Sequence, residues 1–445
     1  MKDSIDFGSM DISTLFRKLL VPTVLGMVIT DGIFVGKGIG SDALAAVNIT
    51  APLFMIAAGI GLMFGVGGSV VASIHLSQGK RKAANINITQ ALVFSAILIL
   101  IMSALCFYFV EPLGRFLGSS DKLLPYVIEY MSWYVPFLVF YEILNISMFY
   151  IRLDGSPNYA MMCNATAAIL NILLDYIFIF EFGWGMMGAA FATSLGTVVG
   201  GLMTLVYLMH YSHDLRLYRI KLSRKSLRMT FRNIGYMVKL GNSAFVSEAS
   251  IACMMFLGNY VFIRNLGEDG VAAFSIVCYF FPIIFMVCNA IAQSVQPIIS
   301  YNFGAGQPER VRKALRLSLR TALICGICFF IFTTLCCRNI VALFIDRSYS
   351  AFDIAVNGIP YFGIGFIFFA INMIGIGYYQ SIERGQRATI ITLLRGVVFM
   401  LIGFFVLPPI LGVPGIWLAV PLAELLTTLY IIGIYFKDRF IVRRR

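Results

Sequence analysis

The sequence is poor in charge. Only 13% of its 445 residues are Asp, Glu, Lys or Arg, about half the share of a soluble globular protein, and 59% are hydrophobic. Trp and His are scarce as well, with three copies each. A water-soluble domain of this length carries more charge on its surface, so that class is excluded. The composition predicts a polytopic membrane protein that lies in the lipid bilayer.

Enzyme motifs are missing too. No GxxxxGK[ST] phosphate loop occurs, which excludes the common ATP-binding motif. The three histidines, His75, His210 and His213, form no zinc pattern, and the nine cysteines lie mostly in apolar runs. An intramembrane enzyme needs a nucleophile–base or metal pair within its spans, and none is visible. We therefore expect no enzyme, and no cofactor beyond a coupling ion.

Twelve apolar segments remain, each near the roughly 20 residues that a helix needs to cross the hydrocarbon. They cover residues 14–36, 47–76, 87–110, 122–147, 160–181, 186–210, 237–263, 274–301, 314–336, 354–379, 388–409 and 412–436. Helices are expected, because an open strand edge in lipid leaves backbone groups unpaired. The predicted fold class is an all-α integral membrane protein with twelve transmembrane helices.

Positive charge is distributed unevenly over the connections between these segments. With the N-terminus inside, 27 of the 34 Lys and Arg residues fall on inside connections or termini and six on outside ones. This bias follows the positive-inside rule, so both termini are predicted to be cytoplasmic. It also accounts for the net charge of +12 without a nucleic-acid surface, and no nucleic-acid partner is expected.

The two halves of the chain resemble each other at one constant offset. Five of twelve positions are identical between GIGSDALAAVNI (38–49) and NLGEDGVAAFSI (265–276). The same offset pairs Gly79 with Gly306. Each half holds six segments, an even number, so both halves enter the membrane from the same side. The halves are therefore predicted to be parallel repeats, each a six-helix bundle.

A basic, amphipathic stretch, RLYRIKLSRKSLRMTFRN, separates the two halves. Such a stretch is typical of a helix that lies along a membrane surface. The predicted organisation is an N-terminal six-helix lobe at 1–213, a cytoplasmic basic linker at 214–236 and a C-terminal six-helix lobe at 237–445.

The acidic residues of most interest are four that fall within predicted spans, where a charge costs a few kcal/mol and usually faces a cavity. They are Asp31, Asp175, Glu248 and Glu424. Asn171 precedes Asp175 by four residues, so both side chains share one helix face. Their oxygens could bind one Na⁺ or share a proton. For each acid, the alternative is a structural polar contact between helices.

The repeat places no acidic counterpart opposite these acids in the other half of the chain. The offset that relates the two halves takes Asp175 to Ile402, whereas Asn145 and Asn372 match. The acids are therefore not part of the structure that the two halves share. Because both aspartates lie in the N-terminal half, ion coupling is predicted to be concentrated in that lobe.

A Gly61-x-x-x-Gly65 motif lies inside the span predicted at 47–76. Glycines at this spacing can hold a phosphate, but within a membrane span they more often allow two helices to approach closely. Close helix packing is the prediction here.

Three stretches carry a resemblance to a known family. They are TDGIFVGKGIGSDALAAVNI, NILLDYIFIF followed by GMMGAAFATSLG, and SVQPIISYNFGAGQPERVRKA. Over nearly the whole chain the sequence resembles the multidrug and toxic compound extrusion (MATE) family, in particular its MepA-like bacterial branch. The resemblance implies two six-helix bundles in a V shape with a central cleft. It also implies export of apolar, often cationic compounds in exchange for Na⁺ or H⁺, in an antiporter that confers drug resistance.

The resemblance implies roles for single residues. Asp31 falls on the family's first-helix aspartate, Asn171 and Asp175 fall on its fifth-helix Asn/Asp pair, and Thr193 falls on a sixth-helix threonine. Together these four residues form the implied cation-coupling site and a candidate Na⁺ site.

Four further residues are substrate or network candidates. Tyr130 and Asn145 fall on fourth-helix residues tied to the cation site. Glu248 matches a seventh-helix glutamate that couples cations in another branch of the family. There the tenth helix supplies an aspartate, but here the position is Asn372. Glu248 is therefore expected to contact substrate or a proton, not a bound metal cation.

The first helix departs from the family pattern. Between Lys18 and Lys37 lie only 18 residues, about 27 Å of helix, whereas the family has about two more turns before its aspartate. Either the helix starts earlier, near Ile12, or the segment is shortened.

The predicted function is secondary active multidrug efflux in a bacterial cell membrane, by a monomer that binds small-molecule drugs and organic cations. The alternative is a lipid or lipid-linked precursor flippase. A cleft lined with arginines would favour the alternative, but apart from the arginines counted with the inside connections only Arg395 falls within a predicted span.

Overall fold

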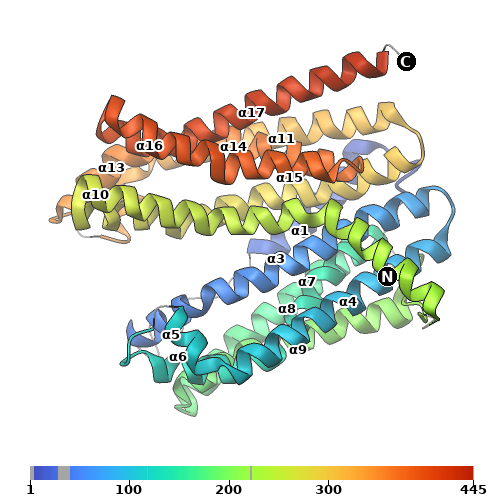
Figure 1. Ribbon diagram of the computed structural model, residues 1–445, viewed down its shortest axis with the longest axis horizontal. Coiled ribbons are helices and arrows are strands. Elements are labelled where there is room, and N and C mark those ends of the chain that lie inside the picture. The colour runs from blue at the N-terminus through green and yellow to red at the C-terminus, as the bar shows by residue number, and fades with distance from the viewer. Residues whose placement is uncertain (1–4, 29–40, 118, 221–222, 346, 444–445) are drawn as a thin grey trace. The chain divides into compact units, whose positions relative to one another are not determined.

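The computed structural model describes residues 5–28, 41–117, 119–220, 223–345 and 347–443 (Figure 1). All regular structure in these ranges is helical. Nine of the described helices are long and apolar enough to cross a membrane, and ten spans result if the pair α13 and α14, bent by 41°, counts as one. The predicted class, an all-α integral membrane protein, is confirmed.

The helices follow the predicted apolar segments, because each segment must satisfy its own backbone hydrogen bonds in lipid. In chain order they are α1 (Ile12–Val28), α3 (Ser41–Ser77), α4 (Arg81–Tyr108), α5 (Val110–Phe116), α6 (Leu124–Tyr134), η1 (Val135–Phe137), α7 (Leu138–Leu153), α8 (Pro157–Asp175), η2 (Tyr176–Glu181), α9 (Gly185–Val206), η3 (Tyr207–Tyr211), α10 (Arg224–Gly304), α11 (Pro308–Leu335), α12 (Cys337–Ala342), α13 (Ser350–Gly363), α14 (Gly365–Ser381), α15 (Gly385–Leu393), η4 (Leu394–Val398), α16 (Phe399–Leu411) and α17 (Val413–Arg443).

Two features explain why fewer than twelve spans are counted. Helix α10 has 81 residues but breaks at Gly267, where φ is 67° and ψ is −157°, and a predicted span lies on each side of the break. Helix α1 begins at Ile12, as in the first of the two alternatives, and its 17 residues are too few for the count. Residues 29–40, which include Asp31, lie outside the described residues. The V-shaped arrangement of two bundles stays a prediction.

The repeat found in the sequence is also present in the backbone structure of the two halves. Helices α4 and α11 both have 28 residues, and the offset that pairs Gly79 with Gly306 also pairs their first residues, Arg81 and Pro308. It likewise pairs the starts of α7 and α14. Gly79 and Gly306 have φ angles of 72° and 69°, and the paired Gly185 and Gly412 have φ angles of 57° and 64°. The matching turns show that the two halves share one helical frame.

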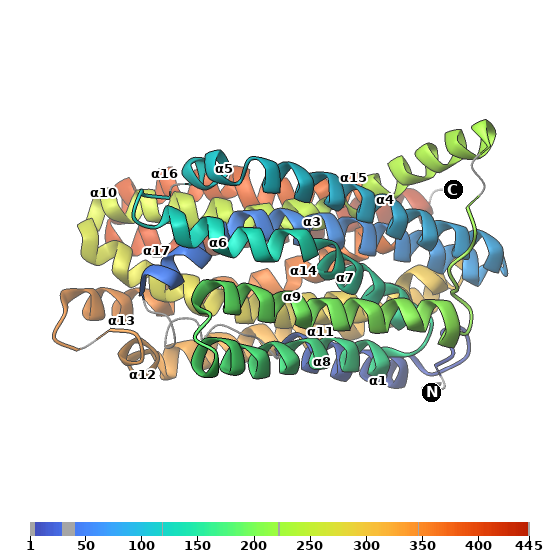
Figure 2. The same ribbon diagram turned by 90° about the horizontal axis from the view of Figure 1, so that it is seen from below.

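The chain divides into two compact units. The first comprises Met1–Phe245 and Ser300–Gln307, and the second comprises Val246–Ile299 and Pro308–Arg445. In the first unit α3 packs against α4 and α7, and α8 lies beside α9 (Figure 2). In the second unit α14 packs against α11 and α17. Helix α10 begins at Arg224, inside the stretch predicted as a linker, and Ser223 caps it.

The Gly61-x-x-x-Gly65 motif packs helix α3 against α7, as predicted. A Cβ atom at Gly61 would lie 2.7 Å from Oε2 of Glu142, and one at Gly65 would lie 2.6 Å from the ring of Phe149. The two glycines therefore make room for side chains of the neighbouring helix. A larger residue at Gly65 would press on the Phe149 ring, and one at Gly61 would force the Glu142 carboxyl aside.

A buried carboxylate ties the turn after α7 to the segment after η3. Asp154 accepts backbone hydrogen bonds from His213, Asp214 and Leu215 at 2.7–2.8 Å, and a fourth from the Tyr207 hydroxyl at 2.8 Å. Burial raises the pKa of Asp154, and the four donors oppose that rise. This cluster holds the end of the first repeat in place.

Candidate cation and substrate site

The first unit contains a cavity of about 330 Å³ among helices α3, α6, α7, α8 and α9. Its wall combines polar and aromatic side chains. It is lined by Phe54, Tyr130, Tyr134, Tyr141, Leu144, Asn145, Asn164, Ala167, Ala168, Asn171, Thr193 and Thr197. Four of these, Tyr130, Asn145, Asn171 and Thr193, are among the residues singled out from the sequence.

A chain of hydrogen bonds joins Asn171, Asp175 and Thr193. The amide nitrogen of Asn171 donates to Oδ2 of Asp175 and to Oγ1 of Thr193, both at 3.2 Å. Thr193 in turn donates to the carbonyl of Ala189 at 3.0 Å. The amide nitrogen of Asn171 thus makes both of its donor contacts within the protein, and the carbonyl oxygen of the same amide can act only as an acceptor or a cation ligand.

Asp175 stands behind the cavity wall. Its side chain is buried, and Asn171 and Thr193, not Asp175 itself, line the cavity. The hydrogen bond from Asn171 links Asp175 to the cavity wall. The predicted fourth member of this group, Asp31, lies outside the described residues.

Two features of the chain create this geometry. Gly196 of α9 lies against the backbone of α8, since a Cβ there would come within 2.6 Å of the carbonyl oxygen of Ala167. This close approach brings Thr193 within reach of Asn171. Helix α8 also changes to a π-helical turn directly after Asp175. Such turns often mark functional positions in helices.

Aromatic rings form another part of the wall. Tyr130 and Tyr134 stack with centroids 5.9 Å apart, and Phe54 meets Tyr134 edge-on at 4.5 Å. The faces of such rings attract organic cations. Asn145 holds its amide in place by donating to the carbonyl of Tyr141 at 2.8 Å. The cavity thus combines π faces with amide and hydroxyl groups.

The other two network candidates lie elsewhere. Glu248 is half-buried on α10, and Asn372 is buried on α14, both in the second unit. Asn372 donates to Oε2 of Glu424 at 2.7 Å and accepts from the Thr428 hydroxyl at 2.9 Å. The tenth-helix position thus lacks a carboxylate of its own but contacts one supplied by α17.

Glu424 also faces the buried cation of the second unit. Arg395 lies 3.8 Å from Oε1 of Glu424, and both side chains are almost fully buried. The Arg395 guanidinium also lies 5.0 Å from the ring centre of Phe369. Arg395 sits in the π-helical turn η4, just as Asp175 adjoins η2. Each unit therefore places a buried charge at a π turn, but the charges have opposite signs.

The repeat relates this pair to the cavity of the first unit. The counterparts of Asn372, Arg395 and Glu424 are Asn145, Ala168 and Thr197, and all three line the cavity. In the second unit the same place is thus occupied by an ion pair. The offset in the sequence gives the three counterparts, and the structure shows that they line one cavity.

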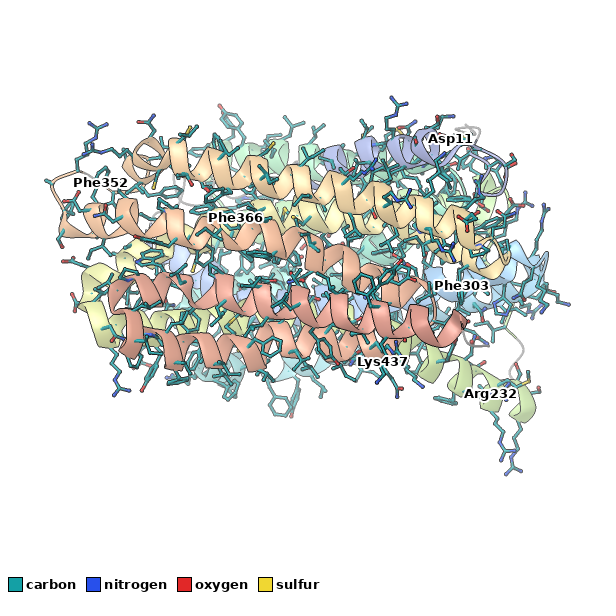
Figure 3. The ribbon with its side chains drawn as sticks, turned by 90° about the horizontal axis from the view of Figure 1, so that it is seen from above. Asp11, Arg232, Phe303, Phe352, Phe366 and Lys437 are labelled. Carbon is teal, nitrogen blue, oxygen red and sulfur yellow. The ribbon has the colours of Figure 1, made fainter. Side chains whose placement is uncertain are left out.

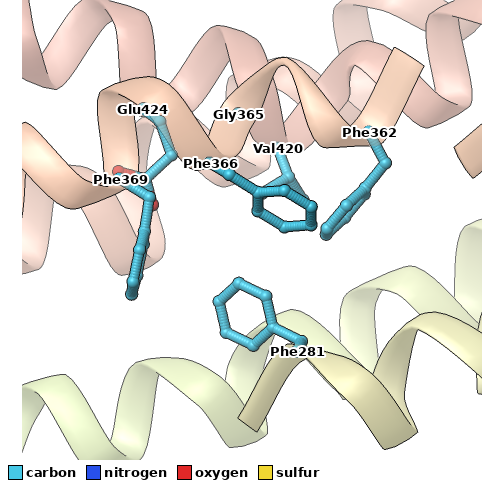
Figure 4. A pocket seen from close by; sticks show the side chains of 7 residues that line it. All are labelled: Phe281, Phe362, Gly365, Phe366, Phe369, Val420 and Glu424. Carbon is cyan, nitrogen blue, oxygen red and sulfur yellow. The ribbon is translucent and has the colours of Figure 1, made fainter. Parts of the chain in front are cut away.

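Phenylalanine side chains fill the rest of the region in the second unit that corresponds to the cavity of the first. Figure 4 shows Phe281, the counterpart of Phe54, pointing toward Phe362, Phe366 and Phe369, with Glu424 beside Phe369. The centroids of Phe281 and Phe369 are 5.3 Å apart. The second unit therefore has a packed aromatic core where the first has a polar cavity, which agrees with the prediction that the acids are not shared by the repeat.

Sequence reasoning missed most of the cavity lining and one acid. Asn164 and Asn171 are seven residues apart, and Thr193 and Thr197 are four apart, so helical spacing was the available signal. The acid is Glu142 on α7, which lies inside an apolar run and is fully buried. Within the described residues neither carboxyl oxygen of Glu142 makes a hydrogen bond.

Glu142 is expected to be a neutral acid, because an ionised carboxylate without donors loses several kcal/mol of hydration. Glu142→Gln should therefore change the free energy of unfolding by less than about 1 kcal/mol. Gly61→Ala, which drives a methyl group into the same carboxyl, should cost about 1–3 kcal/mol. Thermal unfolding in detergent measures both. A cost above about 3 kcal/mol for Glu142→Gln would instead show a paired, ionised side chain.

The fold and the cavity define a polytopic helical membrane protein made of two repeats, with a polar binding cavity inside the first. The sequence model of the MatE family matches residues 20–177 and 243–413, one stretch in each half. The chain belongs to the MatE family, whose members are transporters and not enzymes.

Named relatives support the same assignment. The chain is 28% identical over 444 residues to the "FAD transporter" of Shewanella oneidensis, covering 96% of this chain and 95% of that one. It is 26% identical to the "Multidrug export protein MepA" of Staphylococcus saprophyticus, covering 99% and 96%.

Solved structures share the fold at lower identity. A MATE protein in complex with MaL6 matches with a TM-score of 0.89 and 22% identity over 98% of both chains. An outward-facing multidrug resistance MATE family transporter of the MOP superfamily matches with a TM-score of 0.88, 22% identity and the same coverage.

Proposed function

We propose that this chain is a secondary active exporter, which moves apolar, often cationic compounds across a bacterial cell membrane in exchange for H⁺ or Na⁺. The observation that carries the proposal is the cavity of about 330 Å³, in which Asn171 and Thr193 line the wall and buried Asp175 stands behind them. We expect a monomer with both termini in the cytoplasm.

Asp175 is the centre of the proposed coupling. A Na⁺ ion would take a carboxylate oxygen of Asp175, the carbonyl oxygen of Asn171 and Oγ1 of Thr193, and Asp31 is the proposed fourth ligand. A proton would need only Asp175, whose bond from Asn171 would then weaken. In both cases the incoming cation changes the contact between α8 and α9 that Asn171 and Thr193 maintain.

Substrate and coupling ion then favour different conformations of the first unit. The rings of Tyr130, Tyr134 and Phe54 offer π faces to an organic cation on another part of the wall. The coupling ion can drive export only if it binds one conformation more tightly than the other. We propose that ion binding at Asp175 favours the conformation that has released substrate.

Transport in proteoliposomes tests the proposal. Purified protein would be reconstituted into vesicles loaded with a fluorescent organic cation, and H⁺ and Na⁺ gradients would be imposed separately. We expect efflux above the background of protein-free vesicles with at least one gradient, and the effective gradient identifies the ion. Because one relative is named an FAD transporter, FAD is the second cargo to assay. Efflux of neither cargo under either gradient would refute the proposed function.

The flippase alternative comes second because of the residues that line the cavity. Among the described residues no arginine lines the cavity of about 330 Å³, so it offers no cation to a lipid phosphate. A fluorescent-lipid translocation assay in the same vesicles separates the two functions.

A further inference from the structure

The second unit has a groove of about 580 Å³ over α14, between α11 and α17. It is far larger than a single side chain needs. It is lined by Arg312, Leu315, Arg316, Leu319, Arg320, Leu323, Ile371, Gly375, Tyr378, Tyr379, Ile431, Ile432, Tyr435 and Phe436. Figure 3 labels Lys437, the residue after Phe436, near the C-terminal end of α17.

The groove has a basic end and an apolar end. Arg312, Arg316 and Arg320 follow one another at intervals of four on α11, so they share one helix face. Arg312 pairs with Glu309 at 2.5 Å. Arg316 and Arg320 form no ion pair within the part of the chain that the structure describes. Leu323, the last lining residue on α11, follows Arg320, and the rest of the lining consists of leucines, isoleucines, Gly375 and four aromatic residues.

A further observation concerns the acid that could balance the charge of the basic end. Asp438, the acid at this end of α17, is already paired with Arg384 and Arg387. The groove thus presents two arginines, Arg316 and Arg320, without an ion pair among the described residues.

The repeat shows what covers the same face in the first unit. The counterparts of Arg312 and Arg316 are Asn85 and Thr89 on α4. Their side chains accept hydrogen bonds from the backbone amides of Arg216 at 3.1 Å and Tyr218 at 2.9 Å. A segment of the chain therefore lies on that face of α4. On α11 the corresponding residues are arginines, which select an anion and not a backbone amide.

We propose that this groove binds one anionic phospholipid. Its phosphate contacts Arg316 and Arg320, whose guanidinium groups suit phosphate oxygens. One acyl chain lies along Leu319, Leu323 and Ile432. Leu323 and Ile432 are 39% and 45% exposed, so the apolar end opens to the surroundings of α11 and α17. Basic pockets between transmembrane helices are where anionic lipid headgroups bind.

The apolar end argues for a lipid over a free phosphate. An inorganic anion would use only the arginine end, whereas the cavity continues along the leucines and isoleucines. A zwitterionic lipid would fill the apolar end equally well but would leave the charge of the two arginines unbalanced. The proposal is independent of what the first unit transports.

Lipid binding to the full-length protein tests the proposal. Delipidated protein in detergent would be titrated with phosphatidylglycerol or phosphatidylcholine and read by native mass spectrometry. We expect a distinct site for phosphatidylglycerol that Arg316→Gln/Arg320→Gln weakens about 30-fold, at an unchanged melting temperature. Phosphatidylcholine binding should be weak and unaffected by the substitutions. The matched control is Arg224→Gln/Arg228→Gln, which removes the same charge from exposed positions on α10.

Other outcomes would overturn the proposal. An equal loss in the control would mean general charge attraction, and equal binding of phosphatidylcholine would mean an apolar groove without headgroup selection. Inorganic phosphate that displaces the lipid at similar concentration would mean a free-anion site. Leu323→Trp provides a second variant, because it narrows the apolar end and keeps both arginines. It should weaken phosphatidylglycerol binding and leave inorganic phosphate unaffected.

Discussion

Asp175→Asn is expected to reduce gradient-driven export about 10- to 100-fold, a range typical of the loss of one coupling interaction. Asparagine keeps the size of the side chain and can still bond to Asn171 across the 3.2 Å contact. It cannot take up a proton and binds Na⁺ poorly, so the coupling ion no longer favours one conformation. Efflux of the fluorescent cation from proteoliposomes measures the loss.

Glu181→Gln is the matched control for this prediction. It removes one negative charge from an exposed position at the end of η2, six residues after Asp175. We expect it to transport like the unmodified protein. Substrate binding by Asp175→Asn, measured by fluorescence without a gradient, should persist, because Asp175 does not line the cavity. Normal gradient-driven export by Asp175→Asn would rule out Asp175 as the coupling residue.

Glu424→Gln is expected to destabilise the protein by about 3–5 kcal/mol, because it leaves Arg395 as an unpaired buried cation. Arg395→Met should cost less. In that variant Glu424 can take up a proton, and it keeps the hydrogen bond from Asn372. A larger cost for Glu424→Gln than for Arg395→Met would therefore show that Glu424 can become neutral by taking up a proton, whereas Arg395 stays charged.

The double variant completes the cycle. Arg395→Met/Glu424→Gln removes both charges and keeps similar volumes, so most of the stability should return. Thermal and denaturant unfolding in detergent measure all four proteins. Additive costs in the double variant would show that the two side chains do not interact across the 3.8 Å gap. In every stable variant, transport should follow the amount of folded protein, because no role in ion coupling is assigned to this pair.

Much of the fold could be predicted from the sequence. Low charge and long apolar runs indicate helices in a membrane, because lipid offers no partner to an unpaired backbone group. The constant offset between the halves anticipated helices with matching starts and glycines with matching φ, such as Gly79 and Gly306. The Asn171 and Asp175 pair was also visible, since a spacing of four places two side chains on one helix face.

Other parts of the site could not be predicted in this way. Thr193 was placed by resemblance, and its bond to Asn171 depends on the close approach of α8 and α9 at Gly196. Glu142 was overlooked because a lone glutamate in an apolar run shows nothing of its burial. The role of Asp31 stays a prediction, because that residue lies outside the described ranges.

The sequence by itself determined the membrane class, the helical segments, the repeat and the Asn171–Asp175 face, because these follow from hydropathy and from spacing along one helix. Only the tertiary structure decided that one half of the repeat holds a polar cavity while the other is filled by Arg395, Glu424 and phenylalanines. Arg395 lies in η4 and Glu424 on α17, far apart along the chain. Their contact depends on how those helices rotate and approach, and the local pattern of residues does not specify either.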